Sequence, residues 1–424
     1  MLNFILATFN LTQRQPEKGG RPMLTRQQIE VAATHLKGII RHTELFHSPY
    51  CSRQLETPIY FKCENLQYTG AFKIRGIYND LSQRPPQQLT HGVITASIGN
   101  HAKGLAGTAA QLGIPCHIVM PTGTPLAREL FPREHKATVE LFGLDQSEAE
   151  KHAREIAEKD NLLYVAPGGG LPLLAGYGTI GLEILADLPE LDTLLVPIGR
   201  GSLIAGIATA VKETKPTVRI IGVETAAVPS ATLARRNGKP KLLATRCHTF
   251  AREIAINRVD ENAFPLIEKY VDDIVTVEEE EIARAVVSLM ENSKLVVEGA
   301  GAASLAALLD GLKTHKMGNT VCLLSGGNLE IQNMARVIEQ GILASGHYLK
   351  LRLEMTDIPG ALAHLTHILG ELKTNIFQIS HDRHKSSLPL GRAEVLLDLE
   401  TSGPEHIQDI LLRLEDEGYS PEVV

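Results

Sequence analysis

The stretch Thr69–Gly76 reads T-G-A-F-K-I-R-G and places Lys73 beside an aromatic residue and between two glycines. A lysine in a loop is usually a solvated charge, but Gly70 supplies a turn here and Phe72 supplies an apolar wall. A partly desolvated lysine has a lowered pKa, so its free amine can bond covalently to a carbonyl group and act as a base. The stretch therefore favours a catalytic role for Lys73.

Three further motifs each follow a strand-like apolar run. They are S-I-G-N-H at Ser97–His101, G-R-G-S-L at Gly199–Leu203 and S-G-G-N at Ser325–Asn328. From residue 92 to residue 324 the chain alternates strand-like with helix-like segments, which predicts parallel sheets covered by helices. Ligands bind such sheets at the carboxyl ends of the strands. The motifs stand at those ends, so we expect a ligand site there in an α/β fold.

The motif Gly199–Leu203 has the properties of an anion site. It lies between a predicted strand, Leu194–Val196, and a predicted helix, Leu203–Glu213. At such a junction the backbone N–H groups and the helix dipole attract negative charge. A tight turn would need only one glycine, so the second glycine favours phosphate binding. The motif is not a dinucleotide fingerprint, because the next glycine is Gly206 and the pattern G-x-G-x-x-G fails.

The motif Ser97–His101 also stands between a predicted strand, Val93–Ala96, and a predicted helix, Ala102–Leu112. A capped helix start accounts for the serine and the glycine of this motif but not for its Asn-His pair. A helix N-terminus also attracts a carboxylate. The motif is therefore a candidate for binding a carboxylate-bearing substrate.

The pattern changes at both ends of this region. Near the N-terminus, Thr25-x-x-Gln28 is a capping box that predicts a helix through Lys37, so we expect the fold to begin at about residue 23. After residue 346 the order of predicted elements is β-α-β-β-α-β, a ferredoxin-like α+β unit. Its elements are Tyr348–Met355, Gly360–Leu372, Asn375–Asp382, Ala393–Glu400, Pro404–Glu417 and Ser420–Val424, with Lys385–Gly391 as the hairpin connection.

Together these motifs resemble those of the serine/threonine dehydratases, over residues 24–424. The lysine stretch is closer to that family's usual T-G-S-F-K-I-R-G than to the cysteine synthases or threonine synthases. The C-terminal unit resembles an ACT domain, with D-I-P-G-A-L at Asp357–Leu362 matching the first strand-to-helix turn. The resemblance implies the pyridoxal-phosphate fold type II, which is tryptophan synthase β-like. It divides the chain into an extension (1–22), a catalytic domain (23–345) with a smaller subdomain inserted at about 70–165, and an ACT-like regulatory domain (346–424).

The resemblance also implies roles for individual residues. Lys73 is the Schiff-base residue and the catalytic base. In the family a serine at the position of Ser325 faces the pyridine nitrogen, and a hydroxyl partner leaves that nitrogen neutral, which suits β-elimination over transamination. The residues implied to bind pyridoxal 5'-phosphate are Phe72, Lys73, Asn100, Gly199, Arg200, Gly201, Ser202, Leu203 and Ser325. Those implied to bind the substrate carboxylate are Ser97, Gly99, Asn100 and His101, and those of the regulatory turn are Asp357, Pro359 and Gly360.

The implied activity is that of a threonine ammonia-lyase. Such an enzyme converts threonine or serine to a 2-oxo acid and ammonia, as in amino-acid metabolism and isoleucine biosynthesis. The ACT-like unit is expected to bind an amino-acid effector or to mediate assembly, and we expect a homodimer or homotetramer.

Several positions depart from the family. Arg200 and Ser202 stand where relatives have glycines; Ser202 can donate its hydroxyl to phosphate, whereas Arg200 either adds charge or forbids a left-handed backbone with its Cβ. The segments Ala166–Gly170 and Ala251–Ile254 replace H-P-F-D-D-like and A-D-G-I stretches that border the cofactor in the family. One alternative is therefore a non-catalytic, amino-acid-sensing protein. Another is a serine racemase. It is disfavoured because Ile98, which cannot accept a proton, stands where racemases have a serine that acts as a second base.

Composition disfavours other classes of function. The net charge is −7 and there is no Lys/Arg block, so nucleic acid is not an expected partner. The five cysteines are scattered without a C-x-x-C pair, which favours a reducing compartment, the cytoplasm, over a zinc ribbon or a disulfide framework. No run approaches the roughly 18 apolar residues that cross a membrane. Glu224 matches a cation-binding carboxylate of some relatives but lacks the usual Asp after it, so no metal is expected.

Overall fold

The computed structural model describes residues 23–244, 249–312, 317–329, 334–338, 341, 346–384 and 388–424. The predicted N-terminal extension and part of the predicted hairpin connection, residues 385–387, lie outside them. The first helix, α1 (Arg26–Leu36), begins with the predicted capping box, in which Thr25 and Gln28 each bind the other's backbone N–H. Within these ranges no helix combines the length and the apolarity needed to cross a membrane.

The larger sheet has six strands in the order β1-β2-β10-β7-β8-β9, and only β1 runs antiparallel to its neighbour. Alternate residues of the central strand β10 enter different cores, Val321 and Leu323 on one face and Cys322 and Leu324 on the other. A strand that is apolar on both faces is typical of a parallel sheet covered by helices on both sides. The strand bounds are β1 Leu45–His47, β2 Ile59–Cys63, β7 Thr193–Pro197, β8 Arg219–Thr225, β9 Asp273–Val277 and β10 Thr320–Leu324.

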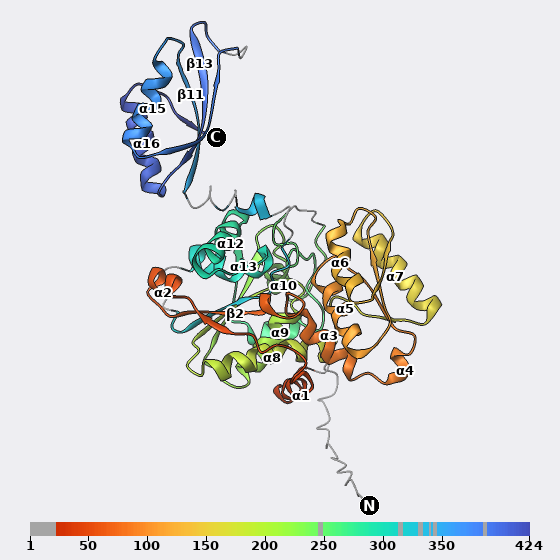
Figure 1. Cartoon of the computed structure of the whole chain (residues 1–424). Coiled ribbons are helices and arrows are strands. Elements are labelled where there is room, and N and C mark those ends of the chain that lie inside the picture. Colours follow the sequence, from red (N-terminus) through yellow and green to blue (C-terminus); the bar gives the residue numbers. More distant parts are fainter. Residues whose placement is uncertain are drawn as a thin grey trace, which may run out of the picture.

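A second, four-stranded sheet is built from the chain between β2 and β7. Its order is β5-β4-β3-β6 and all of its pairs are parallel. Figure 1 shows α5, α6 and α7 around this sheet, with α3 between it and the elements of the larger sheet. The bounds are β3 Val93–Ala96, β4 Cys116–Met120, β5 Thr138–Leu141, β6 Leu163–Tyr164, α3 Lys73–Ser82, α5 Asn100–Leu112, α6 Leu126–Glu134 and α7 Gln146–Asp160. The predicted strand–helix alternation is thus confirmed.

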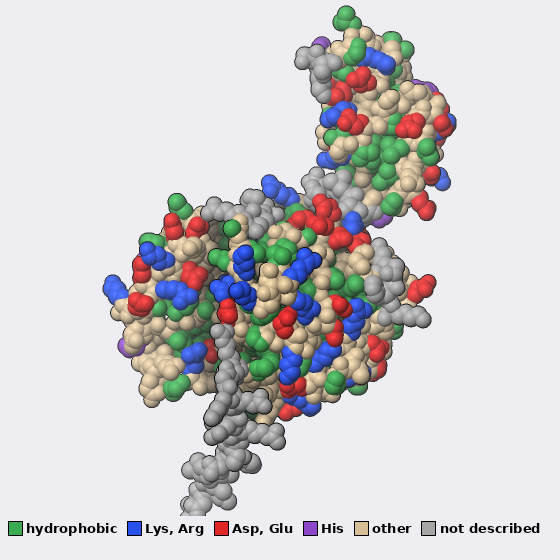
Figure 2. Space-filling model, turned by 180° about the vertical axis from the view of Figure 1, so that it is seen from behind, with side chains coloured by type: hydrophobic (Ala, Val, Ile, Leu, Met, Phe, Trp, Pro, Cys, Tyr) green, Lys and Arg blue, Asp and Glu red, His purple; other side chains and the backbone are tan. Residues whose placement is uncertain are grey.

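The remaining helices, apart from α4 beside the smaller sheet, surround the larger sheet (Figure 1). The predicted helix Ala302–Leu312 begins three residues earlier, as α13 (Gly299–Ala306), and continues as a π-helical turn, Ala307–Gly311. The others are α2 Pro49–Leu55, α4 Pro86–Leu89, α8 Leu171–Asp187, α9 Ser202–Lys212, α10 Ser230–Asn237, α11 Phe264–Tyr270, α12 Glu279–Ser293 and a 3₁₀ turn at Glu64–Leu66. Acidic and basic side chains are interspersed over the face of the molecule seen in Figure 2.

The C-terminal unit is a four-stranded antiparallel sheet in the order β12-β13-β11-β14. Leu349, Leu351, Leu353 and Met355 alternate into its core, as the period of two predicts. Helices α15 and α16 lie on one face of the sheet (Figure 1). The bounds are β11 Tyr348–Thr356, α15 Ala361–Glu371, β12 Asn375–Asp382, β13 Arg392–Glu400, α16 Pro404–Asp416 and β14 Glu422–Val423. This arrangement confirms the predicted ferredoxin-like α+β unit.

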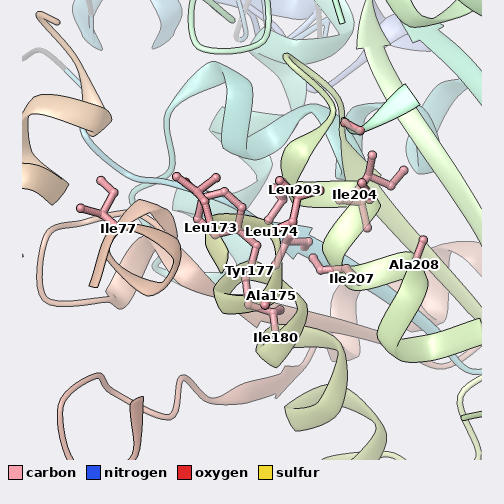
Figure 3. Packing of buried hydrophobic residues seen from close by; sticks show 14 of the residues in the cluster. Ile77, Leu173, Leu174, Ala175, Tyr177, Ile180, Leu203, Ile204, Ile207 and Ala208 are labelled. Atoms are coloured by element: carbon pink, nitrogen blue, oxygen red, sulfur yellow. The ribbon is translucent and has the colours of Figure 1, made fainter. Parts of the chain in front are cut away.

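Helices α3, α8 and α9 pack closely beneath the predicted ligand site. A Cβ on Gly176 of α8 would lie 2.4 Å from the carbonyl oxygen of Arg75, and one on Gly206 of α9 would lie 2.3 Å from that of Leu174. Only glycine permits backbones to approach this closely. Figure 3 shows the apolar side chains between these helices, among them Leu173, Tyr177, Ile204 and Ile207. The packing fixes the N-termini of α3 and α9 relative to each other.

A buried ion cluster also holds α3 in place. The fully buried Arg75 donates from Nε to Glu64 Oε2 at 2.8 Å and from Nη1 to Glu183 Oε1 at 2.6 Å. The buried Lys62 contacts the same Glu183 carboxylate, with Nζ 2.7 Å from Oε2. Because Arg75 lies two residues after Lys73, the cluster ties the lysine loop both to β2 and to α8.

Replacing Arg75 with Met should lower the free energy of unfolding by about 3–5 kcal/mol, because the buried Glu64 carboxylate loses its cationic partner and keeps a hydrogen bond from the neutral Thr43 hydroxyl. The matched control is R26A, which removes the exposed i,i+4 pair between Arg26 and Glu30. That control should cost less than about 1 kcal/mol. Thermal and urea unfolding midpoints of both variants provide the measurement. Equal midpoints for R75M and R26A would contradict a stabilising role for the cluster.

Candidate active site

One pocket gathers all of the predicted cofactor-binding residues. Phe72 and Lys73 enter it from the start of α3, Asn100 from α5, the motif Gly199–Leu203 from the junction of β7 and α9, and Ser325 from the end of β10. These segments are far apart in the sequence but meet at the carboxyl ends of strands, as the parallel sheets predict. The pocket is also lined by Pro167, Tyr177, Pro197, Glu253, Ile254, Glu298 and Ala300.

Lys73 is held between aromatic and backbone partners. Its Nζ lies 5.2 Å from the centre of the Phe72 ring, which packs edge-on against Tyr177. Phe72 N–H donates to the carbonyl oxygen of Ser325 at 3.2 Å, so backbone pairing joins the lysine loop to the S-G-G-N motif. Burial lowers the pKa of Lys73, and the negative charge of Glu253 opposes that shift. The lowered pKa favours the free amine that was predicted for this residue.

The loop Gly199–Leu203 has the backbone of an anion cradle. Gly201 has φ of +90°, and it precedes the first residue of the apolar helix α9. Arg200 is not among the residues with positive φ, so its Cβ does not conflict with the left-handed turn. Its guanidinium instead lies 3.5 Å from Asp260, which also accepts a hydrogen bond from Ser202 Oγ at 3.1 Å. Burial raises the pKa of Asp260, and Arg200 opposes the shift.

Asn100 is the centre of a hydrogen-bond network at the start of α5. Its Nδ2 donates to Glu298 Oε1 at 2.6 Å, and its Oδ1 accepts from Asn328 Nδ2 at 2.5 Å. Lys103 Nζ in turn donates to Asn328 Oδ1 at 2.7 Å. Asn100 N–H donates to Glu253 Oε1 at 3.2 Å. The network connects the S-I-G-N-H and S-G-G-N motifs inside the pocket.

The other predicted carboxylate-binding residues lie beside the pocket and do not line it. Ser97 Oγ accepts from Gly99 N–H at 3.3 Å. His101 is buried with Nε2 3.0 Å from the carbonyl oxygen of Val165. Burial lowers the pKa of His101 to about 3, so the ring is neutral and donates to that carbonyl. Of this predicted set, Asn100 alone lines the pocket among the described residues.

Two carboxylates belong to the site although the sequence analysis gave them no role in it. Glu298 immediately precedes α13, and burial together with the charge of Glu253 raises the pKa of Glu298 to about 7. In the sequence Glu298 precedes Gly299 and Gly301, a pattern that a helix start explains without any role for the carboxylate in the site. The sequence analysis identified Ala251–Ile254 as a departure from the family's A-D-G-I stretch. It did not predict that the Glu253 side chain points into the pocket.

The predicted regulatory turn lies between β11 and α15. Asp357 N–H donates to Gly391 O at 2.9 Å, and Arg383 Nη2 lies 3.3 Å from Asp357 Oδ1. Gly360 has φ of +91°, and a Cβ there would meet nothing within 4 Å. Elsewhere, Glu224 accepts hydrogen bonds from the backbone of Ala231 and Thr232 at the start of α10.

Comparison with known proteins agrees with this geometry. The model of the family described as pyridoxal-phosphate dependent enzyme matches residues 36–326. The chain belongs to this family. It is 49% identical to an L-threonine ammonia-lyase of Geobacter sulfurreducens, over 95% of this chain and 100% of that protein. It is 39% identical to an L-threonine ammonia-lyase of Thermotoga maritima over the same shares of the two chains.

Solved structures show the same fold. The processed form of threonine deaminase isoform 2 from Solanum lycopersicum superposes with a TM-score of 0.72 at 32% identity, covering 76% of this chain and 91% of that one. Maize serine racemase superposes with a TM-score of 0.71 at 28% identity, covering 76% and 99%. The predicted fold class is confirmed, and pyridoxal phosphate is the cofactor.

The pocket residues fit pyridoxal phosphate. Lys73 supplies an amine whose lowered pKa suits a covalent bond to an aldehyde, and the loop before α9 supplies backbone N–H groups for a phosphate. A Cβ on Gly199 would lie 2.9 Å from the carbonyl oxygen of Glu253, so this part of the cradle admits only glycine without a shift of its neighbours.

The raised pKa of Glu298 predicts a pH-dependent stability. In the unfolded chain this carboxyl loses its proton near pH 4.5, whereas in the folded protein it keeps the proton up to about pH 7. The folded state therefore binds more protons between these values, and the stability that Glu298 contributes falls as the pH rises through that window.

The E298Q variant keeps the acceptor for Asn100 but has no charge. It should be more stable than the parent protein at pH 8, and the difference should shrink at pH 4.5. Thermal unfolding at both pH values measures this, with the exposed E30Q as control. A difference between E298Q and the parent that does not change with pH would refute the assignment.

Proposed function

We propose that this chain is a pyridoxal-phosphate-dependent threonine or serine dehydratase, which converts a 3-hydroxy amino acid to a 2-oxo acid and ammonia. The observation that carries the proposal is the meeting of Lys73, the anion cradle before α9 and Ser325 in one pocket. The full-length similarity to two L-threonine ammonia-lyases supports the same reaction.

Pyridoxal phosphate, when bound, supplies the electron sink that stabilises negative charge at the substrate Cα. In the proposal Gly199–Leu203 holds its phosphate, and Ser325 presents a hydroxyl in place of an acidic partner. Asn100 and Phe72 complete the set that holds and orients the cofactor. The hydroxyl does not place a formal charge beside the ring, which favours elimination of the β-hydroxyl over transamination.

Lys73 is proposed to take the α-proton of the substrate. Its Nζ is buried against Phe72 and the surrounding pocket, and this burial lowers the pKa of Lys73, which favours the neutral amine. Its place at the start of α3 is fixed by backbone pairing with Ser325 and by the buried Arg75 two residues later. A proton acceptor held in this way needs no reorganisation when the proton is transferred.

The start of α5 is proposed to bind the substrate carboxylate. Asn100 provides the first helical N–H and an amide side chain, both inside the pocket. A helix N-terminus favours negative charge through its unpaired N–H groups and its dipole. We retain Ser97, Gly99 and His101 in this role as part of the same loop, with His101 acting through its buried ring on the shape of the loop.

We further propose a regulatory role for the C-terminal unit. The catalytic domain would comprise residues 23–345, with the smaller subdomain at about 70–165, and residues 346–424 would bind an amino-acid effector in a homodimer or homotetramer. The turn Asp357–Gly360 supports this, because the Asp357 carboxylate and the open surface at Gly360 lie together at the start of α15.

Replacing Lys73 with Ala should abolish turnover of threonine and serine. After incubation with pyridoxal phosphate, the parent protein should absorb visible light, and borohydride reduction should fix the cofactor on the peptide that contains Lys73. The matched control is K269A, which changes an exposed lysine of α11. Near-normal activity of K73A would refute the assignment. Amino-acid binding without any turnover in the parent would favour the sensing alternative, and D-serine production would favour a racemase.

Regulation is tested on the full chain. Turnover of threonine is measured with each common protein amino acid added singly, and at least one of them should change the KM for threonine. The G360V variant should lose that response, because a β-branched residue is strained at φ of +91° and would distort the turn. A response that persists unchanged in G360V, or the lack of any response in the parent, would refute a regulatory role for this turn.

A further inference from the structure

Glu253 introduces a carboxylate where the resembling family has a glycine. It lies in Ala251–Ile254, which reads A-R-E-I in place of A-D-G-I. Both Glu253 and Ile254 line the pocket, whereas the preceding residue, Arg252, is exposed. The change is therefore an acidic side chain added to the inside of the site.

The Glu253 carboxylate is seated on the start of α5. Its Oε1 accepts the N–H of Asn100 at 3.2 Å, and a Cβ on Gly99 would lie only 1.9 Å from that oxygen. The residue that caps this helix, Gly99, provides no side-chain acceptor of its own. Glu253 thus supplies the carboxylate that the N-terminus of α5 favours.

We propose that Glu253 is a specificity-determining residue that competes with the substrate carboxylate for the N-terminus of α5. This inference rests on the proposed function, which places the substrate carboxylate at that same position. An amino acid that enters the pocket must displace the internal carboxylate before its own can reach Asn100. Substrates and inhibitors that carry an α-carboxylate are therefore bound more weakly than the rest of the pocket allows.

The charges around Glu253 indicate that it competes electrostatically with the substrate carboxylate and does not merely fill space. The charge of Glu253 acts on Lys73, Lys103 and Glu298, and of these Lys73 and Glu298 also line the pocket. Glu298 is itself buried, so an incoming carboxylate would add a negative charge to a site that already holds two acidic side chains. Like charges brought together in a poorly solvated site repel strongly. Removing Glu253 relieves both the competition and the repulsion.

The expected signature is a change in binding with little change in the chemical step. E253G should lower the KM for threonine while kcat changes much less, because a competitor for the ground state has been removed. The dissociation constant for L-alanine, which has no β-hydroxyl to lose, should fall roughly tenfold, the scale of one hydrogen bond to a charged group. E253Q, which keeps the size and the acceptor but not the charge, should fall between the parent and E253G.

The experiment is isothermal titration calorimetry of the protein loaded with pyridoxal phosphate. The parent, E253G and E253Q are titrated with L-alanine and with L-alaninamide, which has the same amine and side chain but no carboxylate. R252D is the matched control, because it restores the family residue at the adjacent exposed position and alters charge outside the pocket lining. The expected gain is confined to L-alanine and to the Glu253 variants.

Two results would overturn the proposal. One is unchanged or weaker L-alanine binding in E253G and E253Q; the other is an equal gain for L-alaninamide, which would show that Glu253 merely fills space. If E253G does not fold, E253Q alone decides by the same comparison. Failure of the proposed function is separate, since it would appear as absent turnover of threonine and serine whatever the binding of L-alanine.

Discussion

The site depends on the buried ion cluster of Arg75, Glu64, Glu183 and Lys62. Arg75, Glu64 and Lys62 are fully buried, and a charge so placed is tolerated only while its partner stays at hydrogen-bond distance. The cluster therefore holds the end of β2, the helix α3 and the helix α8 in one arrangement. Lys73 begins α3, so its position in the pocket depends on the ion pairs that Arg75 makes two residues further along the same helix.

The side chains that depart from the family's glycine-rich loop both contact Asp260. Arg200 lies 3.5 Å from Asp260, and Ser202 donates to the same carboxylate, so both new side chains already interact with a residue of the protein itself. In the proposed function, phosphate binding at this loop then depends on the backbone N–H groups and on the left-handed Gly201. Asp260 balances the charge of the added arginine beside this loop.

Much of this arrangement could be predicted from the sequence because local signals determine it. The capping box at Thr25 and the alternation in Leu349–Met355 each act within a few residues, and both predictions agree with the structure. The loop Gly199–Leu203 lines the pocket, while its binding of phosphate stays a prediction. The directions of side chains follow from contacts between distant segments instead. Glu253 accepts a hydrogen bond from Asn100, which is more than a hundred residues away in the sequence, and His101 points towards Val165. The sequence analysis therefore gave Glu253 no role in the site, and it predicted that His101 binds the substrate carboxylate.

The same contacts determine how basic Lys73 is. Burial lowers its pKa and Arg200 adds to that effect, whereas Glu253, Asp260 and Glu298 raise it. Desolvation outweighs the three carboxylates, so the net direction favours the neutral amine. Glu298, whose own pKa is raised to about 7, is only partly ionised near neutral pH and so opposes the shift less than a full charge would. The pKa of Lys73 therefore depends on the acidic side chains around it. Glu253 has the largest effect of these carboxylates on Lys73, and it stands where the family has a glycine.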